Sequence, residues 1–149
     1  MKAVIQRVNN AEVKINSKIH SSISKGLLIL LGISVYDTDS EPITLALKCI
    51  NLRIFDDENG KMNLSVTDIK GEVMVVSQFT LFADARRGRR PSYSLAAPPD
   101  KAVPLYEKFV NEIAKFAPVK TGVFGADMNI YLENDGPVTI ILDSFELKQ

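Results

Sequence analysis

Apolar and polar residues form strand-like patterns in the first part of the chain. From Ala3 to Ile15 they alternate in part, which predicts one long strand or two short ones broken near Asn9 and Asn10. Ile19 to Ile23 alternates after the turn signal Asn16–Lys18, so it is expected to return as a hairpin strand. Leu27 to Ile33 is short and continuously apolar, which predicts a central strand covered on both faces.

Two segments carry apolar residues at helical spacing. In the first, residues 43–50 present one apolar face, and Asp39 or Ser40 can cap the helix. In the second, Asp100 can cap a helix with a similar stripe. Pro104 lacks an amide donor, so this helix can also begin nearer to Pro104.

The second half of the chain adds strands and one long loop. Glu72 to Phe79 is the clearest strand pattern. Met128 to Leu132 and Val138 to Leu142 predict two more strands, joined by a turn over Glu133–Pro137. Ala83 to Pro99 is a loop long enough to suggest a function.

This order of elements predicts the fold class α/β, of the α+β type. We expect mixed, largely antiparallel β-sheets forming a barrel-like or two-layer core with two covering helices. A length of 149 residues indicates one domain over residues 1–149. Hydrophobic residues make up 46% of the chain, which is enough for a core without disulfides or metals.

Charge gives only a local indication of a nucleic-acid partner. Eighteen basic and 18 acidic residues cancel, so no global attraction to phosphate is expected. A cluster in the long loop could nevertheless contact nucleic-acid phosphates: Arg86, Arg87, Arg89 and Arg90. The alternative is a solvated loop, or one that pairs with carboxylates across a subunit interface.

Cysteine use and apolar length bear on location. Cys49 is the only cysteine, so a reducing compartment fits, and we expect a small buried side chain rather than a nucleophile. The longest apolar stretch, Gly26 to Val35, is too short to span a bilayer. No basic leader segment follows Met1. The expected location is cytoplasmic.

The usual catalytic groups are scarce. His20 is the only histidine and is predicted on the polar side of a hairpin strand, which disfavours Ser-His and Cys-His pairs. One histidine and one cysteine also disfavour a transition-metal site. The acidic run Asp56–Glu58 could bind magnesium, but beside Asn59–Gly60 it is more simply a solvated turn. We therefore predict no metal and no cofactor.

Polar groups at the end of the clearest predicted strand are the first candidates for chemistry. Ser77, Gln78 and Thr80 follow the apolar run 73–76. On a strand, Ser77 and Phe79 would point to one side and Gln78 and Thr80 to the other. The residues alone leave two interpretations: a binding site, or a strand end whose side chains hydrogen-bond the next turn.

Two further features are ambiguous when taken alone. Gly136–Pro137 is expected to form a plain turn between strands, since only about 5–6% of X-Pro bonds in folded proteins are cis. Arg7 is either an exposed strand charge, which its residue type favours, or a support for a polar group nearby.

Two motifs, Ser77–Leu81 and Gly136–Thr139, give the chain a resemblance to the D-aminoacyl-tRNA deacylase (D-Tyr-tRNA deacylase) family. Neither motif departs from the family pattern, and start, spacing and length agree from Met1 to about Leu142. Shorter matches fill the intervals: Gln6–Val8, Gly26–Leu28, Arg53–Phe55, Gly60–Leu64, Arg90–Ser92 and Ala126–Met128. The loop Arg86–Arg90 is richer in arginine than is usual in the family.

The resemblance implies a homodimer that hydrolyses the ester joining a D-amino acid to the 3′ end of tRNA, and that also acts on glycyl-tRNA mischarged on tRNA-Ala. It implies a cis bond at Gly136–Pro137, in a turn inserted across the dimer into the partner's pocket. The roles implied for single residues are a pocket for the terminal adenosine and ester carbonyl (Ser77, Gln78, Phe79, Thr80), nearby support (Phe124, Met128, Val138, Thr139) and a hold on the turn (Arg7).

Such a site can work without a catalytic triad. An aminoacyl ester is already activated, so a positioned water, backbone donors near Phe79 and Thr80, and the ribose 2′-OH as proton relay can suffice. Thr80 then shapes the site, because no base is available to activate it; an acyl-enzyme on Thr80 is the alternative. Carbonyls of Gly136 and Pro137 would bind the α-amino group and collide with an L side chain.

Two other classes of function stay open. One is a non-catalytic RNA-binding β domain, and the other is a hydrolase of small D-amino-acid esters or peptides. The presence of two motifs at the right separation argues against both. We expect aminoacyl-tRNA as the partner, with no DNA and no membrane.

Overall fold

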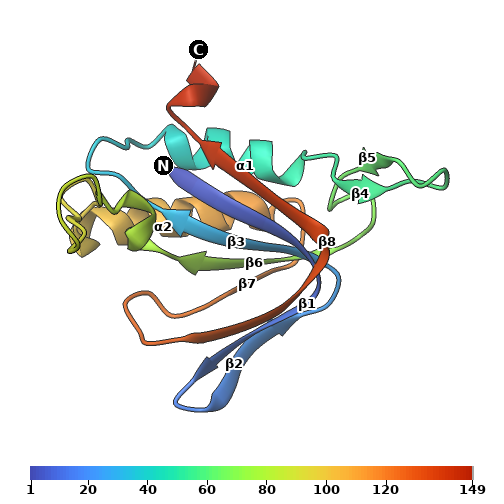
Figure 1. Cartoon of the computed structure of the whole chain (residues 1–149). Helices are drawn as coiled ribbons and strands as arrows, with labels where there is room; N and C mark the ends of the chain where they lie inside the picture. The colour runs from blue at the N-terminus through green and yellow to red at the C-terminus, as the bar shows by residue number, and fades with distance from the viewer. Residues whose placement is uncertain (149) are drawn as a thin grey trace.

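β1 (Lys2–Ile15) is the central strand of the computed structural model, which describes residues 1–148. Along one edge it pairs antiparallel with β8 (Asn129–Asp143). Along the other edge, its first part pairs with β3 (Gly26–Gly32) and its last part with β2 (Lys18–Ile23). The sheet bends around β1, because β1 changes neighbours halfway along this edge (Figure 1).

The other side of the sheet is parallel. β3 pairs with β6 (Glu72–Ser77), and β6 pairs with β7 (Val119–Thr121). Parallel neighbours need a crossover connection, and the chain provides α1 (Glu41–Ile50) before β6 and α2 (Pro99–Ala114) before β7. The predicted mixed α+β fold, with a barrel-like sheet and two helices, is confirmed.

Short elements complete the chain. β4 (Phe55–Asp56) and β5 (Met62–Leu64) form a separate antiparallel pair between α1 and β6. Two 3-10 turns follow, η1 (Phe79–Phe82) directly after β6 and η2 (Glu146–Lys148) after β8.

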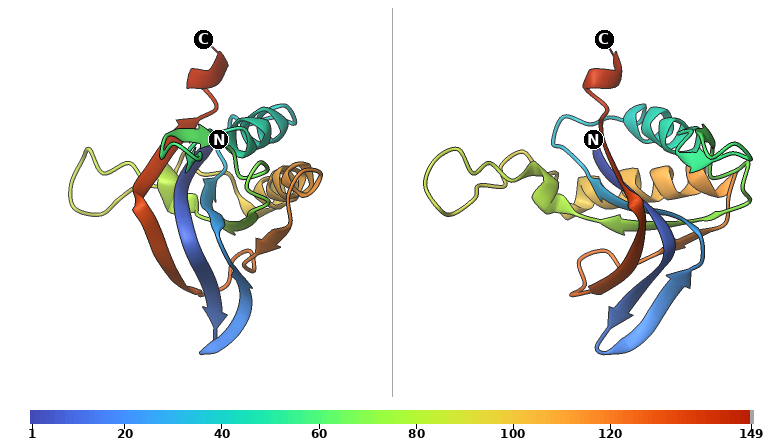
Figure 2. Two further views of the ribbon diagram at one scale, coloured as in Figure 1. Left: turned by 90° about the vertical axis from the view of Figure 1, so that its right-hand side faces the viewer. Right: turned by 45° about the vertical axis from the view of Figure 1, so that its right-hand side comes forward.

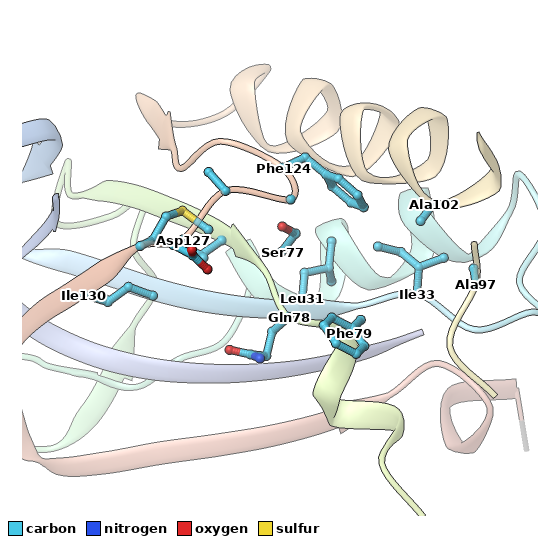
Figure 3. Close-up of a pocket in the computed structure, with 14 residues that line it drawn as sticks. Leu31, Ile33, Ser77, Gln78, Phe79, Ala97, Ala102, Phe124, Asp127 and Ile130 are labelled. Carbon is cyan, nitrogen blue, oxygen red and sulfur yellow. The ribbon is translucent and has the colours of Figure 1, made fainter. Parts of the chain in front are cut away.

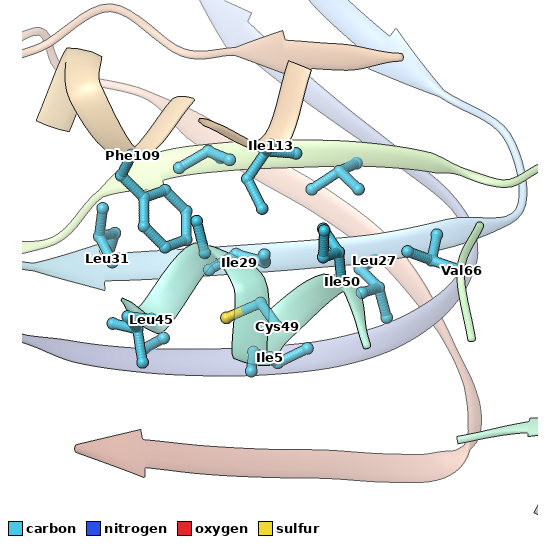
Figure 4. Close-up of a cluster of buried hydrophobic side chains, with 14 of the residues drawn as sticks. Ile5, Leu27, Ile29, Leu31, Leu45, Cys49, Ile50, Val66, Phe109 and Ile113 are labelled. Atoms are coloured by element: carbon cyan, nitrogen blue, oxygen red, sulfur yellow. The ribbon is translucent and has the colours of Figure 1, made fainter. Parts of the chain in front are cut away.

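Both helices cover the same face of the sheet (Figure 2). The main core lies between them and the strands, and its fully buried members include Ile5, Leu27, Ile29, Leu31, Leu45, Ile50, Phe109 and Ile113 (Figure 4). A second cluster comprises Val8, Ala11, Val13, Ile23, Leu28, Met74 and Val76. Both clusters draw on β3 and β6, which are therefore covered on both faces, as the continuous apolar runs predict.

The strand boundaries differ in part from the predictions. β1 is one strand, and near Asn9 and Asn10 it shifts its register with β8 instead of breaking. The strand that begins at Glu72 ends at Ser77 rather than Phe79, because the chain turns into η1. The two strands predicted over 128–142 are wrong, since one strand, β8, spans this region and its middle bulges outward.

The helix starts also differ. α2 begins at Pro99, after an N-cap at Pro98, and runs through Pro104, so a start nearer Pro104 is wrong. Proline is favoured in the first turn of a helix, where its missing N–H has no acceptor to lose. Asp100 lies in that first turn rather than at the cap. Ser40 is the N-cap of α1, but its side chain makes no capping hydrogen bond.

Two single-residue predictions are confirmed. Cys49 is fully buried in the main core, and burial raises the pKa of its thiol to about 12. His20 is exposed on β2. None of the helices in residues 1–148 combines the length and apolar character needed to cross a bilayer.

Candidate active site

A cavity of about 330 Å³ opens at the C-terminal end of β6. Four parts of the chain form its wall. They are the end of β3, the end of β6, the segment that leads into α2 with the start of that helix, and the β7–β8 connection with the first residues of β8. The lining residues are Leu31, Ile33, Val76, Ser77, Gln78, Phe79, Ala97, Ala102, Phe124, Gly125, Ala126, Asp127, Met128 and Ile130 (Figure 3).

The first motif lines this cavity because the strand stops within it. The N–H of Gln78 donates to the Leu31 carbonyl at 2.8 Å, which extends the pairing of β6 with β3 by one residue. The Gln78 carbonyl then accepts from the N–H of Leu81 at 3.3 Å and starts η1. Ser77, Gln78 and Phe79 therefore all line the cavity, and the predicted alternation of sides fails beyond Ser77.

Thr80 lies apart from the lining residues of the cavity. Its Oγ1 accepts a hydrogen bond from the side-chain amide of Gln78, which does line the cavity. Phe79 stands at the mouth with 56% of its surface exposed. An amide that donates to Thr80 cannot also remove its proton, so the structure gives Thr80 no general base at this contact.

The β7–β8 connection supplies the facing wall. In Figure 3, Phe124 and Phe79 lie on opposite sides of Ser77. Phe124 packs edge-on against Tyr106, whose hydroxyl donates to the Val75 carbonyl at 2.8 Å. Phe124 and Met128 thus lie close to the motif, at half-buried positions.

Asp127 is a lining residue to which sequence reasoning gave no role. It is the one ionisable side chain among the residues that line the cavity within 1–148. The available signal was the triplet Ala126–Met128, one of the shorter matches to the family.

The second motif forms a bulge in the middle of β8. Gln6 pairs with Thr139 and Val8 with Asn134, so β8 uses more residues than β1 between the two pairs. The extra residues include Gly136 and Pro137, which are exposed and joined by a cis peptide bond. Gly136 has φ +148°, a conformation that side chains disfavour, and a Cβ there would meet the Val138 nitrogen at 2.6 Å.

Asn134 closes this bulge with its side-chain amide. The N–H of Val138 donates to Asn134 Oδ1 at 2.8 Å, and Asn134 Nδ2 donates to the Val138 carbonyl at 3.1 Å. Nδ2 also donates to Gln6 Oε1 at 2.7 Å, and Val138 is buried. Sequence reasoning gave Asn134 no role of its own; the available signal was its position two residues before Gly136, in the same run as the second motif.

Arg7 supports the same bulge from β1. Its Nε donates to the Asp135 carbonyl at 2.8 Å, and its Nη1 donates to the Ile54 carbonyl at 2.7 Å. The carboxylates of Asp135 and Asp56 lie 3.3 and 3.6 Å from the guanidinium. Arg7 is only 6% exposed, so the prediction of an exposed strand charge is wrong. The carbonyls and carboxylates around it compensate its burial.

The bulge lies away from the cavity in the same chain. Arg7 is level with Leu27 of β3, whereas the cavity begins at Leu31, which is level with Ser77 of β6. Four residues along a strand span about 13 Å. Within one chain, the structure therefore does not bring Ser77 together with Gly136, Pro137, Val138, Thr139 or Arg7.

The arginine loop begins just beyond η1 and projects from the body of the protein (Figure 2). Asp84 and Ser92 close it with two backbone hydrogen bonds of 2.8 and 2.9 Å. Arg86 donates two hydrogen bonds to the Asp84 carboxylate, at 2.8 and 2.7 Å. These contacts lower the pKa of Asp84 to about 2. Arg87, Arg89 and Arg90 are exposed.

A metal role for the acidic turn finds no support in the geometry. Among residues 1–148, no three His, Cys, Asp or Glu side chains lie together so as to hold a metal ion. The Asp57 carboxylate instead accepts from the backbone N–H groups of Asn59 and Lys61, which lower its pKa.

Comparison with known proteins points to the same family as the resemblance. A family model described as D-Tyr-tRNA(Tyr) deacylase matches residues 4–143. A "D-aminoacyl-tRNA deacylase" of Thermosipho melanesiensis is 60% identical over 97% of each chain, and one of Sulfurihydrogenibium is 52% identical over 99% of this chain and 100% of its own.

Solved structures extend the likeness to the fold. A "c-Myc DNA Unwinding Element Binding Protein" superposes with a TM-score of 0.91 at 43% identity, covering 96% of this chain and 98% of its own. A probable eukaryotic D-amino acid tRNA deacylase reaches 0.81 at 16% identity, over 95% and 97% of the two chains, which is a likeness of fold alone. By the extent of the family match and the identity to these relatives, the chain belongs to the D-Tyr-tRNA(Tyr) deacylase family.

Proposed function

We propose that this protein hydrolyses the ester bond of D-aminoacyl-tRNA and releases the free D-amino acid and the tRNA. The observation that carries the proposal is that the first signature motif lines the cavity at the end of β6. A volume of about 330 Å³ lies at the lower end of the range for small-ligand pockets, which suits the aminoacyl end of the substrate. We place the activity in the cytoplasm, since the lone thiol of Cys49 needs no oxidising compartment.

In the reaction we propose, a water attacks the ester carbonyl and the bond to the ribose 3′ oxygen breaks. The ribose 2′-OH relays the proton to the leaving oxygen. The donors to the oxyanion are the N–H of Phe79, which lines the cavity, and the N–H of Thr80, the next residue of η1, because the first N–H groups of a helical turn have no partner within the turn. One such donor is typically worth about 10²–10³ in kcat.

Thr80 is not the nucleophile in this mechanism. Its hydroxyl is held by the side chain of Gln78 and lies outside the cavity lining. The alternative is an acyl-enzyme on Thr80, which would need a base within reach and a rotation into the cavity.

Chirality is read by Gly136 and Pro137 of a second copy of the chain. Their carbonyls bind the α-amino group, and an L side chain collides with main chain that has no rotamer with which to retreat. Support comes from the exposure of both residues and from the clamp formed by Asn134 and Arg7. Activity is then broad across D side chains. Glycyl-tRNA, including glycine mischarged on tRNA-Ala, is partly accepted, because glycine has no side chain to collide.

A homodimer follows from this assignment, since within one chain the bulge and the motif are offset by four residues, or about 13 Å, along the strands. An independent argument is the outer edge of β8, which pairs with no other strand in residues 1–148. Ile141 on this edge strand is 72% exposed. Long unpaired edges with apolar side chains promote association.

The activity test compares D- and L-tyrosyl-tRNA and D-tyrosyl-adenosine. We expect release of D-tyrosine from both D esters and little from the L ester. Absence of hydrolysis of every ester would favour a non-catalytic RNA-binding domain. Equal rates on tRNA and on free adenosine esters would favour a hydrolase of small D-amino-acid esters. Equal hydrolysis of D- and L-tyrosyl-tRNA would refute the collision model.

The subunit test uses cysteines in a Cys49→Ala background. Cysteines placed at Thr139 and Phe79 should be joined between two chains by a short bismaleimide. The product is a covalent dimer on a denaturing gel. A protein with cysteines at Thr139 and Asn111, an exposed residue of α2, is the control and should give far less dimer. Equal yields from both proteins would argue against the shared site.

The arginine loop contacts phosphates of the tRNA acceptor stem in this proposal. DNA binding is the second candidate, since a structure 43% identical to this chain carries the name of a DNA-binding protein. Competition between tRNA and duplex DNA for the protein at fixed salt separates the two. We expect tRNA to be preferred.

A further inference from the structure

Two exposed aromatic rings stand between the cavity and the arginine loop. The rings of Phe79 and Tyr93 meet edge to face, with centroids 5.0 Å apart and planes at 68°. Phe79 is 56% and Tyr93 is 40% exposed, although both side chains are large and apolar. In such a pair, neither ring covers more than one face of the other, so aromatic surface stays open to a further ring.

The backbone fixes Tyr93 relative to both features. On one side, Ser92 is tied to Asp84 by two backbone hydrogen bonds that close the arginine loop. On the other side, the N–H of Ala97 donates to the Ile33 carbonyl at 2.9 Å, and both residues line the cavity. The segment from Ser92 to Ala97 therefore runs from the base of the loop to the cavity wall.

The arginines of the loop divide into two kinds. Arg86 is committed to Asp84 by two side-chain hydrogen bonds, and this pair sits at the closed base of the loop. Arg87, Arg89 and Arg90 are exposed and form no ion pair with any group of residues 1–148. The base is thus braced internally, while three guanidinium groups at the tip face solvent.

The two rings and the three exposed arginines form a continuous strip beside the cavity: Phe79, Tyr93, Arg87, Arg89 and Arg90. We propose that this strip binds the single-stranded nucleotides that precede the terminal adenosine of the substrate. Tyr93, backed by Phe79, stacks on a base, and Arg87, Arg89 and Arg90 contact the phosphates where this single strand joins the acceptor stem. The inference rests on the proposed function, because it takes the cavity as the site of the terminal adenosine. Unpaired RNA ends are held in this way by other proteins, through aromatic stacking combined with basic side chains.

The test compares tRNA with a substrate that lacks the preceding nucleotides. Tyr93→Ala should raise the KM for D-tyrosyl-tRNA roughly 5- to 150-fold, the range for loss of one stacked base. It should leave the hydrolysis of D-tyrosyl-adenosine unchanged. Tyr93→Phe keeps the ring and should behave as wild type on both substrates. An equal rise in KM for both substrates, or no rise for tRNA, would refute RNA binding by the strip.

Binding gives a second readout that does not depend on turnover. A short RNA ending in CCA, with a fluorescent purine at the penultimate position, should be quenched by wild type and by Tyr93→Phe but not by Tyr93→Ala. Arg89→Glu should weaken binding and lower the slope of log K against log salt by about 1. Arg86→Glu is the matched loop variant, and it should lower that slope less.

The outcomes separate this inference from the proposed function. If wild type hydrolyses no D-aminoacyl ester, the proposed function fails. The quenching experiment still tests whether the strip binds RNA. If hydrolysis is D-specific but unaffected by Tyr93→Ala, only the strip fails. A shift of the monomer–dimer equilibrium by Tyr93→Ala, with an unchanged KM for tRNA, would assign the rings to a subunit contact and overturn the proposal.

Discussion

The side-chain amide of Asn134 pairs with both backbone groups of Val138, at 2.8 and 3.1 Å, and so closes the bulge that contains Gly136 and Pro137. The same amide donates to Gln6 on the neighbouring strand. One side chain thus replaces the cross-strand pairing that the bulge interrupts, which gives the exposed turn a fixed position on β8.

Asn134→Asp should loosen the bulge. The change replaces the Nδ2 donor by an oxygen that faces the Val138 carbonyl and Gln6 Oε1. The Val138 carbonyl then loses this donor, and Gln6 Oε1 keeps only the 3.5 Å hydrogen bond from Thr139, at an expected cost of about 1–3 kcal/mol. We expect a lower unfolding midpoint in urea and a smaller ratio of D- to L-tyrosyl-tRNA hydrolysis. Asn111→Asp, on the exposed face of α2, is the control. A reduced midpoint with an unchanged ratio would limit Asn134 to stability.

Arg7→Lys should weaken the link that Arg7 forms between the bulge and the segment that leads into β4. A lysine ammonium cannot donate to the Asp135 and Ile54 carbonyls in the planar geometry of a guanidinium, and hydrogen bonds to charged groups contribute about 1.5–3 kcal/mol. The free energy of unfolding should fall by a similar amount. Arg53→Lys is the control, since Arg53 is exposed and donates to a single carbonyl. Similar losses in both variants would contradict a specific role for Arg7.

Thr80→Ala should remain active, because Thr80 contacts Gln78 and lies outside the cavity lining. A fall of kcat within about tenfold would fit a loosened Gln78, whereas loss of a covalent nucleophile costs far more. Rapid-quench analysis of wild type should find no protein-bound tyrosine. Complete loss of activity together with an accumulating acyl-enzyme would establish the covalent alternative.

Ile141→Glu should weaken dimer formation, because a charge would stand on the open edge of β8 near its C-terminal end. Sedimentation should detect more monomer, and deacylase activity should fall in parallel as protein concentration is lowered. Ile19→Glu, at an equally apolar and 62% exposed position on β2, should leave both unchanged. An active monomer would contradict a site shared between subunits.

Alkaline pH should destabilise the protein through Cys49. Burial raises the pKa of this thiol from 9.0 to about 12, so the folded state favours the neutral form. Below pH 9.0 the thiol is neutral in both the folded and the unfolded state, so stability does not depend on its ionisation. As pH rises from 9.0 towards 12, the thiol ionises only in the unfolded chain, and the free energy of unfolding falls. Urea unfolding of Cys49→Ala should depend less steeply on pH in this window. In the native protein the Cys49 thiol should resist alkylation, whereas in the unfolded protein it should react.

The pattern of apolar residues was sufficient to predict elements whose geometry depends only on neighbouring residues in the sequence. The apolar runs identified β1, β3 and β6, and helical spacing identified α1 and α2, since each pattern follows from the geometry of its own element. The same reasoning failed at Ser77 and at Pro104, where the chain leaves a strand or continues a helix against local preference. Neighbouring structure, such as the Leu31 carbonyl that receives the Gln78 amide, decides such boundaries.

The sequence by itself determined the element types, the burial of Cys49 and the presence of both motifs. Only the tertiary structure decided that Arg7 is buried, that Asn134 closes a bulge instead of a hairpin turn, and that the two motifs lie apart in one chain. Arg7 and Asp135 are separated by 128 positions, and their contact depends on the register between β1 and β8. Hydrophobic periodicity indicates which face of each strand is buried, but it does not locate a bulge, because a bulge shifts the pairing without changing which residues are apolar.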